Sequence, residues 1–181
     1  MAAPTRIYLT GFMGTGKSTI GSIGANVLGY DFADLDTLIE RAAQSSISVY
    51  FQTHGEAAFR TLEREQLEGT AALANHVIAL GGGALTSEYN LNATLRLGTV
   101  IYLKASVEAL MQRLWRGRVR RPMLQDEYGV PLKMGPLRER ITTLLAAREP
   151  FYSRAHITIE TDGLSLGQTV DAFVHAVRLW H

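Results

Sequence analysis

The sequence predicts an α/β fold of three layers, in which a five-stranded parallel sheet lies between two layers of helices. Short β-prone segments alternate with helical patterns along the whole chain. Glycine-rich loops or acidic residues follow the first three of these β-prone segments. Such alternation is typical of a parallel sheet covered by helices on both faces, which binds ligands beyond the carboxyl ends of its strands. We therefore expect the functional residues at those ends.

Five short segments carry the strand signal, and the clearest are apolar runs of about four residues. In chain order, the predicted strands are residues 7–10, 30–33, 77–80, 100–103 and 157–159. The first ends at Gly11, and the third ends at Gly81, Gly82 and Gly83. The second ends at the acidic triplet that contains Asp34 and Asp36.

Apolar residues at helical spacing occupy the intervals between the strands. After the first strand, Ile20, Ile23 and Val27 share one face, and Gly29 is suited to end that helix. The other predicted helices lie at about 36–44, at about 55–73, around 107–114, before Arg148, and after the last strand to about residue 179.

Residues 116–136 fit neither period and carry three glycines and three prolines among polar residues. A loop of this length inside a compact domain is usually a functional lid or a disordered insertion. We expect a mobile lid at about 116–136 within a single domain that covers 1–181.

Composition excludes several classes of function. The 181 residues are 46% hydrophobic and carry a net charge of +1, so no overall field attracts nucleic acid or a membrane surface. The longest apolar runs are far shorter than the roughly 20 residues of a membrane-spanning helix. The absence of cysteine excludes disulfides, thiolate nucleophiles and Cys-ligated zinc. With no secretory signal at the start, we expect a cytoplasmic protein without nucleic-acid or membrane partners.

The strongest motif is residues 11–18, GFMGTGKS, which matches the phosphate-binding P-loop pattern G-x-x-x-x-G-K-[ST]. Glycines allow successive backbone N–H groups and the helix N-terminus to face a phosphate. Lys17 would reach the β and γ phosphates of ATP, and the Ser18 hydroxyl would bind Mg²⁺. The expected nucleotide-binding residues here are Gly14, Thr15, Gly16, Lys17, Ser18 and Thr19.

Asp34 and Asp36 follow a strand that should lie near the P-loop. A P-loop enzyme needs a carboxylate at a neighbouring strand end to hold hydrated Mg²⁺ or to accept a hydroxyl proton, and Asp34 is placed for this. The alternative is that both aspartates only cap the helix that follows.

Two groups of arginines are candidates for binding anions. Arg60 shares a helix face with Glu56 and lies near Glu63, which surface ion pairing alone would explain. A second cluster next to the lid comprises Arg113, Arg116, Arg118, Arg120 and Arg121. Closing a guanidinium over the phosphates would stabilise transferring charge, whereas the alternative is a solvated or RNA-binding patch.

Together these residues resemble the shikimate kinase family, P-loop enzymes of the nucleoside-monophosphate-kinase structural group. The similarity runs nearly end to end. It includes the phosphate loop, Asp34 and Asp36, Gly55-Glu56 with Phe59, Arg60 and Glu63, the glycines 81–83, Arg121-Pro122, and Arg148 with Pro150 and Tyr152.

The resemblance implies phosphoryl transfer from MgATP to the 3-hydroxyl of shikimate, in aromatic amino acid biosynthesis. It implies that shikimate binds Asp36, Arg60, Gly81, Gly82, Gly83 and Arg148, with Glu63 orienting Arg60. Arg121 would contact the transferring phosphate, Arg113 or Arg116 the adenine, and Asp34 would serve Mg²⁺ and the hydroxyl proton. We expect a monomer. The alternatives are another small-molecule kinase, such as a gluconate kinase, and a noncatalytic ATP-binding module.

Overall fold

The computed structural model describes residues 5–115 and 122–180. Its sheet has five strands in the order β2-β3-β1-β4-β5, and every neighbouring pair is parallel, which confirms the predicted fold class. The strands are β1 (Arg6–Thr10), β2 (Asp31–Asp34), β3 (His76–Ala79), β4 (Thr99–Lys104) and β5 (Ile157–Glu160). Each of the five predicted strands is therefore present, with ends shifted by no more than a residue or two.

Seven α-helices connect and cover the strands in the described part of the chain. They are α1 (Lys17–Leu28), α2 (Leu35–Ala43), α3 (Ile47–Gly69), α4 (Glu88–Leu97), α5 (Val107–Trp115), α6 (Met134–Tyr152) and α7 (Leu166–Trp180). None of the helices in these described ranges has the length and apolar character needed to cross a bilayer.

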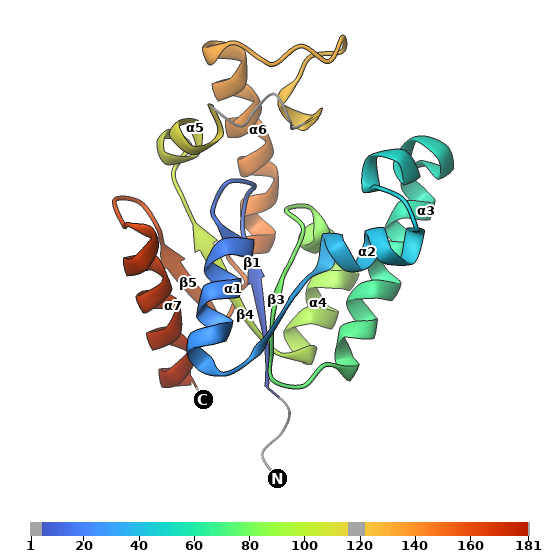
Figure 1. Ribbon diagram of the computed structural model, residues 1–181. Coiled ribbons are helices and arrows are strands. Elements are labelled where there is room, and N and C mark those ends of the chain that lie inside the picture. The colour runs from blue at the N-terminus through green and yellow to red at the C-terminus, as the bar shows by residue number, and fades with distance from the viewer. Residues whose placement is uncertain (1–4, 116–121, 181) are drawn as a thin grey trace.

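The core lies on both faces of the sheet, because the strands of a parallel sheet direct apolar side chains to both sides and helices cover each side. On one face, α1 and α7 cover Ile7, Leu9 and Ile101. On the other, α3 and α4 cover Tyr8, Ile78 and others. In Figure 1, α5 and the start of α6 rise beyond one side of the sheet, and α2 with the start of α3 rises beyond the other.

Strand register explains why the functional loops meet. β1 lies in the centre, so its carboxyl end, which leads into the P-loop, has β3 and β4 as neighbours. β2 pairs with β3 such that Asp34 is opposite Ala79, two residues before Gly81. The acidic triplet, the triple glycine and the P-loop therefore emerge side by side at one edge of the sheet.

Two helical regions differ from the expectation. α3 begins at Ile47 rather than near residue 55, since Ser46 caps it by accepting a bond from the Val49 N–H at 3.3 Å. Gly55 interrupts the helix with φ 80°, so the predicted start marks a kink instead. No sequence pattern predicted α4, whose inward face carries Asn90 and Thr94 among its apolar residues.

The predicted lid is only partly within the described residues, since 116–121 lie outside them. From Pro122 onward the chain forms a short 3-10 turn, Pro122–Leu124, and an isolated bridge between Gln125 and Pro131. Asp126 accepts bonds from the N–H groups of Tyr128 and Val130, each at 2.9 Å. α6 begins at Met134, so the predicted end of the lid at 136 was two residues beyond the helix start.

Candidate active site

The P-loop curls because its three glycines, Gly11, Gly14 and Gly16, adopt positive φ angles that other residues rarely do. Gly14 has φ 84° and Gly16 has φ 91°. A Cβ at Gly14 would also lie 2.8 Å from the Leu114 side chain. Gly16 caps α1, and its carbonyl accepts the first helical bond from the Ile20 N–H at 2.8 Å. The positive end of the α1 dipole therefore opens at the centre of the loop, where an anion is stabilised.

Lys17 and Ser18 form the first turn of α1 and are held by defined partners. The Lys17 ammonium donates to the carbonyls of Gly11 at 2.8 Å and Phe12 at 3.1 Å, which holds it beside the loop. The Ser18 hydroxyl donates to Asp34 Oδ2 at 2.7 Å. Asp34 Oδ1 accepts the Asp36 N–H at 3.0 Å, so Asp34 also caps α2. Asp34 therefore caps α2, as the alternative interpretation predicted, and also contacts the P-loop serine.

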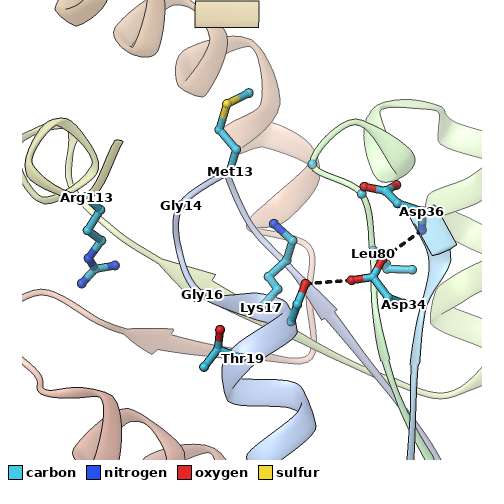
Figure 2. Close-up of a pocket in the computed structure, with 12 residues that line it drawn as sticks. Met13, Gly14, Gly16, Lys17, Thr19, Asp34, Asp36, Leu80 and Arg113 are labelled. Atoms are coloured by element: carbon cyan, nitrogen blue, oxygen red, sulfur yellow. Dashed lines mark hydrogen bonds between the residues drawn. The ribbon is translucent and has the colours of Figure 1, made fainter. Parts of the chain in front are cut away.

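A cavity of about 430 Å³ opens over these residues, as Figure 2 shows. In that view Lys17 lies between Arg113 on one side and the two aspartates on the other. The lining residues are Met13, Gly14, Gly16, Lys17, Ser18, Thr19, Asp34, Asp36, Leu80, Gly81, Gly82 and Arg113.

Among the predicted nucleotide-binding residues 14–19, only Thr15 is not part of the cavity lining. It is buried, and both its hydroxyl and its N–H turn toward the Phe12 carbonyl, at 2.9 and 3.3 Å. Its side chain supports the curl of the loop from beneath.

Asp36 faces the cavity from the first turn of α2. Protein packed around its carboxylate displaces part of the surrounding water. This partial burial raises the pKa of Asp36 to about 6, with the charge of Asp34 adding to the rise and Lys17 opposing it. A Cβ at Gly81 would lie 2.5 Å from Asp36 Oδ1, so only glycine leaves room for the carboxylate there.

Arg60 approaches the triple glycine from α3. Its Nη1 is 2.9 Å from Oε2 of Glu63, and its Nη2 is 3.4 Å from Oε1 of Glu56. The Glu63 side chain is only 4% exposed, and burial raises its pKa while the bond to Arg60 opposes that rise. A Cβ at Gly83 would lie 3.7 Å from Arg60 Nη1, which places the guanidinium against the loop.

Arg148 reaches the same loop from α6. A Cβ at Gly82 would lie 3.3 Å from Arg148 Nη1. The guanidinium carbon lies 5.5 Å from the centre of the Phe12 ring, and Nη2 is 4.0 Å from the Met123 sulfur. Two cations from separate helices thus converge on neighbouring glycines, an arrangement suited to a small carboxylate.

The arginine cluster beside the lid divides between described and undescribed residues. Arg113 lines the cavity, and its guanidinium donates to the Thr161 hydroxyl at 3.0 Å and carbonyl at 2.9 Å. Arg116 and Arg121, predicted to contact nucleotide and transferring phosphate, lie outside the described residues.

Other residues at the site had no role assigned from the sequence. Met13 and Leu80 line the cavity, and Phe12 lies beneath Arg148. Their positions directly inside the P-loop motif or directly before the triple glycine were the available signal. The Tyr152 hydroxyl donates to the Gly82 carbonyl, a contact between residues 70 apart that spacing does not reveal.

Comparison with known proteins places this geometry in context. The family model described as shikimate kinase matches residues 13–178. A shikimate kinase of Chlorobium chlorochromatii is 44% identical over 175 residues, which cover 97% of this chain and 92% of the relative. A shikimate kinase of Salinibacter ruber is 45% identical over 88% of this chain and 78% of its own length.

Solved structures give the same result. A shikimate kinase from Bacteroides thetaiotaomicron superposes with a TM-score of 0.88 at 33% identity, covering 97% of this chain and 99% of that one. One from Acinetobacter baumannii, in complex with shikimate, has a TM-score of 0.84 at 35% identity and covers 98% and 94%. A gluconokinase from Sinorhizobium meliloti, at 15% identity and a TM-score of 0.60, covers 98% and 97% and shares the fold alone.

Proposed function

The chain belongs to the shikimate kinase family, phosphotransferases that act on a shikimate hydroxyl, and we propose that its cavity transfers the γ-phosphoryl group of MgATP to the 3-hydroxyl. One observation carries this assignment to residues. Arg60 lies beside Gly83 and Arg148 beside Gly82, and Gly81 and Gly82 line the cavity that the P-loop opens, whereas Gly83 and the two arginines are not among its lining residues. The candidate carboxylate site therefore adjoins the phosphate site through this glycine loop.

The nucleotide occupies the P-loop side. Backbone N–H groups of Gly14, Thr15 and Gly16, with the start of α1, receive the phosphates, and Lys17 exchanges its carbonyl partners for phosphate oxygens. Thr19 lines the same side of the cavity. From the family resemblance, Arg113 or Arg116 contacts the adenine, and of these two Arg113 is described and lines the cavity.

Ser18 and Asp34 are the residues that would hold Mg²⁺. Their oxygens lie 2.7 Å apart, and magnesium is commonly held by one or two protein oxygens together with waters and substrate phosphates. When bound, the ion neutralises charge on the β and γ phosphates. Asp34 is also our candidate for accepting the proton of the 3-hydroxyl.

Shikimate occupies the side of the cavity lined by Asp36, Gly81 and Gly82, next to Gly83. Arg60 and Arg148 bind its carboxylate, and Asp36 accepts bonds from its hydroxyls. Gly81 and Gly82 allow close approach, since a side chain at either would crowd Asp36 or Arg148, and Gly83 lies in ordinary contact distance of Arg60. Arg121, by family resemblance, stabilises the transferring phosphoryl group. Catalysis is then mainly positioning and charge stabilisation.

The test is ADP release by purified protein with MgATP, measured with shikimate, with gluconate and with no acceptor. We expect release that depends on shikimate and on Mg²⁺, and a loss of about a hundredfold or more in kcat for Lys17→Ala. Release with gluconate alone would support the gluconate kinase alternative. ATP binding without release for either acceptor would support a noncatalytic module.

We also propose that the protein acts as a monomer in the cytoplasm, without nucleic-acid or membrane partners. The net charge of +1 supports this, because a nearly neutral chain has no overall attraction to polyanions. Sedimentation velocity at several protein concentrations tests the monomer, and a mass that doubles with concentration contradicts it.

A further inference from the structure

The last turn of α6 is fixed against the triple glycine by a buried tyrosine. Tyr152 is fully buried, and its hydroxyl donates to the carbonyl of Gly82. Burial raises the pKa of Tyr152 to about 12, and Arg148 opposes this rise, so the phenol keeps its proton at neutral pH. The hydroxyl is therefore a permanent donor to this loop.

A second buried tyrosine holds the same turn from the sheet. The Tyr102 hydroxyl, on β4, donates to Glu149 Oε2 at 2.6 Å. The Tyr102 and Tyr152 rings lie 5.1 Å apart at an angle of 37°. Burial, followed by the bond to Glu149, raises the pKa of Tyr102 well above its usual value. The helix turn that carries Glu149 and Tyr152 is thus tied to both the strand and the glycine loop.

This turn also carries Arg148. Residues four apart lie on one helix face, so Arg148 and Tyr152 both face the loop. Both side chains reach Gly82. A Cβ at Gly82 would lie 3.3 Å from Arg148 Nη1, and the Tyr152 hydroxyl donates to the Gly82 carbonyl. The guanidinium and the tyrosine hydroxyl therefore meet the loop at the same glycine, from adjacent positions on one helix face.

We propose that Tyr152 is a positioning residue for shikimate binding, which holds Gly82 and the α6 turn together so that Arg148 meets the substrate carboxylate in a fixed geometry. The inference deepens the proposed function and rests on Arg148 binding that carboxylate. Tyr152 itself does not contact the reacting atoms. Its loss should weaken capture of shikimate more than it slows phosphoryl transfer.

The test compares Tyr152→Phe with Tyr8→Phe, each of which removes one buried hydroxyl and leaves the ring. Tyr8 is equally buried, and its hydroxyl bonds Thr70 Oγ1 at 2.8 Å, away from the cavity. We expect the KM for shikimate to rise about three- to tenfold in Tyr152→Phe, with the KM for ATP within about twofold of wild type. Tyr8→Phe should lower the thermal midpoint about as much as Tyr152→Phe does, and it should leave both KM values unchanged.

A further arm uses Tyr102→Phe, which frees Glu149 but leaves the bond to Gly82. We expect a smaller rise in the KM for shikimate than Tyr152→Phe gives. If Tyr152→Phe lowers only the thermal midpoint, or raises both KM values equally, the tyrosine is structural and the inference fails. Wild-type protein that releases no ADP with shikimate would instead overturn the proposed function, so the two failures are distinguishable.

Discussion

Arg60 has two acidic partners that differ in burial, and this difference indicates which one fixes its position. The Glu63 side chain is 4% exposed and 2.9 Å away, whereas Glu56 is 66% exposed and 3.4 Å away. An exposed pair at helical spacing contributes little, because water and side-chain entropy oppose it. A buried carboxylate with a short bond restricts the guanidinium much more strongly. The surface ion-pair explanation thus suits Glu56 and fails for Glu63.

We therefore predict different effects for Glu63→Gln and Glu56→Gln. Glu63→Gln should raise the KM for shikimate about five- to twentyfold, since Arg60 loses its charged buried partner and its fixed orientation. Glu56→Gln, the matched control, should change it less than about twofold. Steady-state kinetics at saturating ATP measure both. Equal effects of the two substitutions would contradict the role given to Glu63.

The raised pKa of Asp36 predicts a pH dependence of shikimate binding. Below about pH 6 its carboxyl is protonated, and above this value it is ionised and accepts hydroxyl bonds more strongly. The KM for shikimate should therefore fall as pH rises from 5 to 7. In Asp36→Asn the KM should be higher throughout and should lose this step, which kinetics in a constant-ionic-strength buffer series measure.

Stability gives an independent check with the opposite sign. Because the pKa of Asp36 in the fold lies above its ordinary value of 3.8, the folded state binds more protons than the unfolded state between about pH 4 and 6. The contribution of Asp36 to stability therefore falls as pH rises through that window. The free energy of unfolding of Asp36→Asn, relative to wild type, should rise over the same window; a flat difference would mean that the pKa of Asp36 is ordinary.

At the scale of structural elements, the glycine loop after β3 packs so closely on its neighbours that a side chain at Gly81 would clash. A Cβ at Gly81 would come within 2.5 Å of Asp36 Oδ1, closer than real Cβ contacts. Gly81→Ala should therefore move Asp36 or the loop and raise the KM for shikimate about tenfold or more. Gly69→Ala at the end of α3, where a Cβ meets nothing within 4 Å, is the control. An unchanged KM in Gly81→Ala would show that the loop adapts.

Elements with a clear apolar pattern could be predicted from the sequence, whereas α4, whose buried face carries two polar residues, could not. β3 and β4 are continuous apolar runs and were placed within a residue or two. α4 escaped because Asn90 and Thr94 occupy its buried face, where Asn90 donates to the Ala84 carbonyl at 2.9 Å and Thr94 to the Asn90 carbonyl at 2.7 Å. These bonds make polar residues acceptable inside the protein, but periodicity counts only apolar ones.

Some residues of the candidate site could likewise be predicted from the sequence, and others could not. The P-loop residues and Asp34 could be placed from local spacing, because their chemistry depends on a short motif at a strand end. The convergence of Arg60 with Arg148 could not be derived from spacing, since it joins helices 88 positions apart through the loop at Gly82 and Gly83. Only the family resemblance indicated it. Neither the spacing nor the family resemblance indicated that Arg113 binds Thr161.

For the whole molecule, the P-loop depends on helix packing on the far side of α1. Gly24 lies on that side, and a Cβ there would lie 2.4 Å from the Phe173 ring on α7. Phe173 is fully buried in the core cluster that includes Ile7, Leu9 and Ile101 from the sheet. A displacement of α1 would therefore disturb the sheet and the start of the helix that holds the phosphates.

We predict that Gly24→Ala lowers the free energy of unfolding by about 1–3 kcal/mol, because the overpacked ring must move. If the chain is a single domain, far-UV circular dichroism and the fluorescence of Trp115 and Trp180, which lie on α5 and α7, should report the same shift in denaturant midpoint. Gly167→Ala on α7, where a Cβ meets nothing within 4 Å, controls for the extra methyl group. A shift in only one signal would mean that α5 and the lid region unfold separately from the sheet, and the expectation of one domain would be wrong.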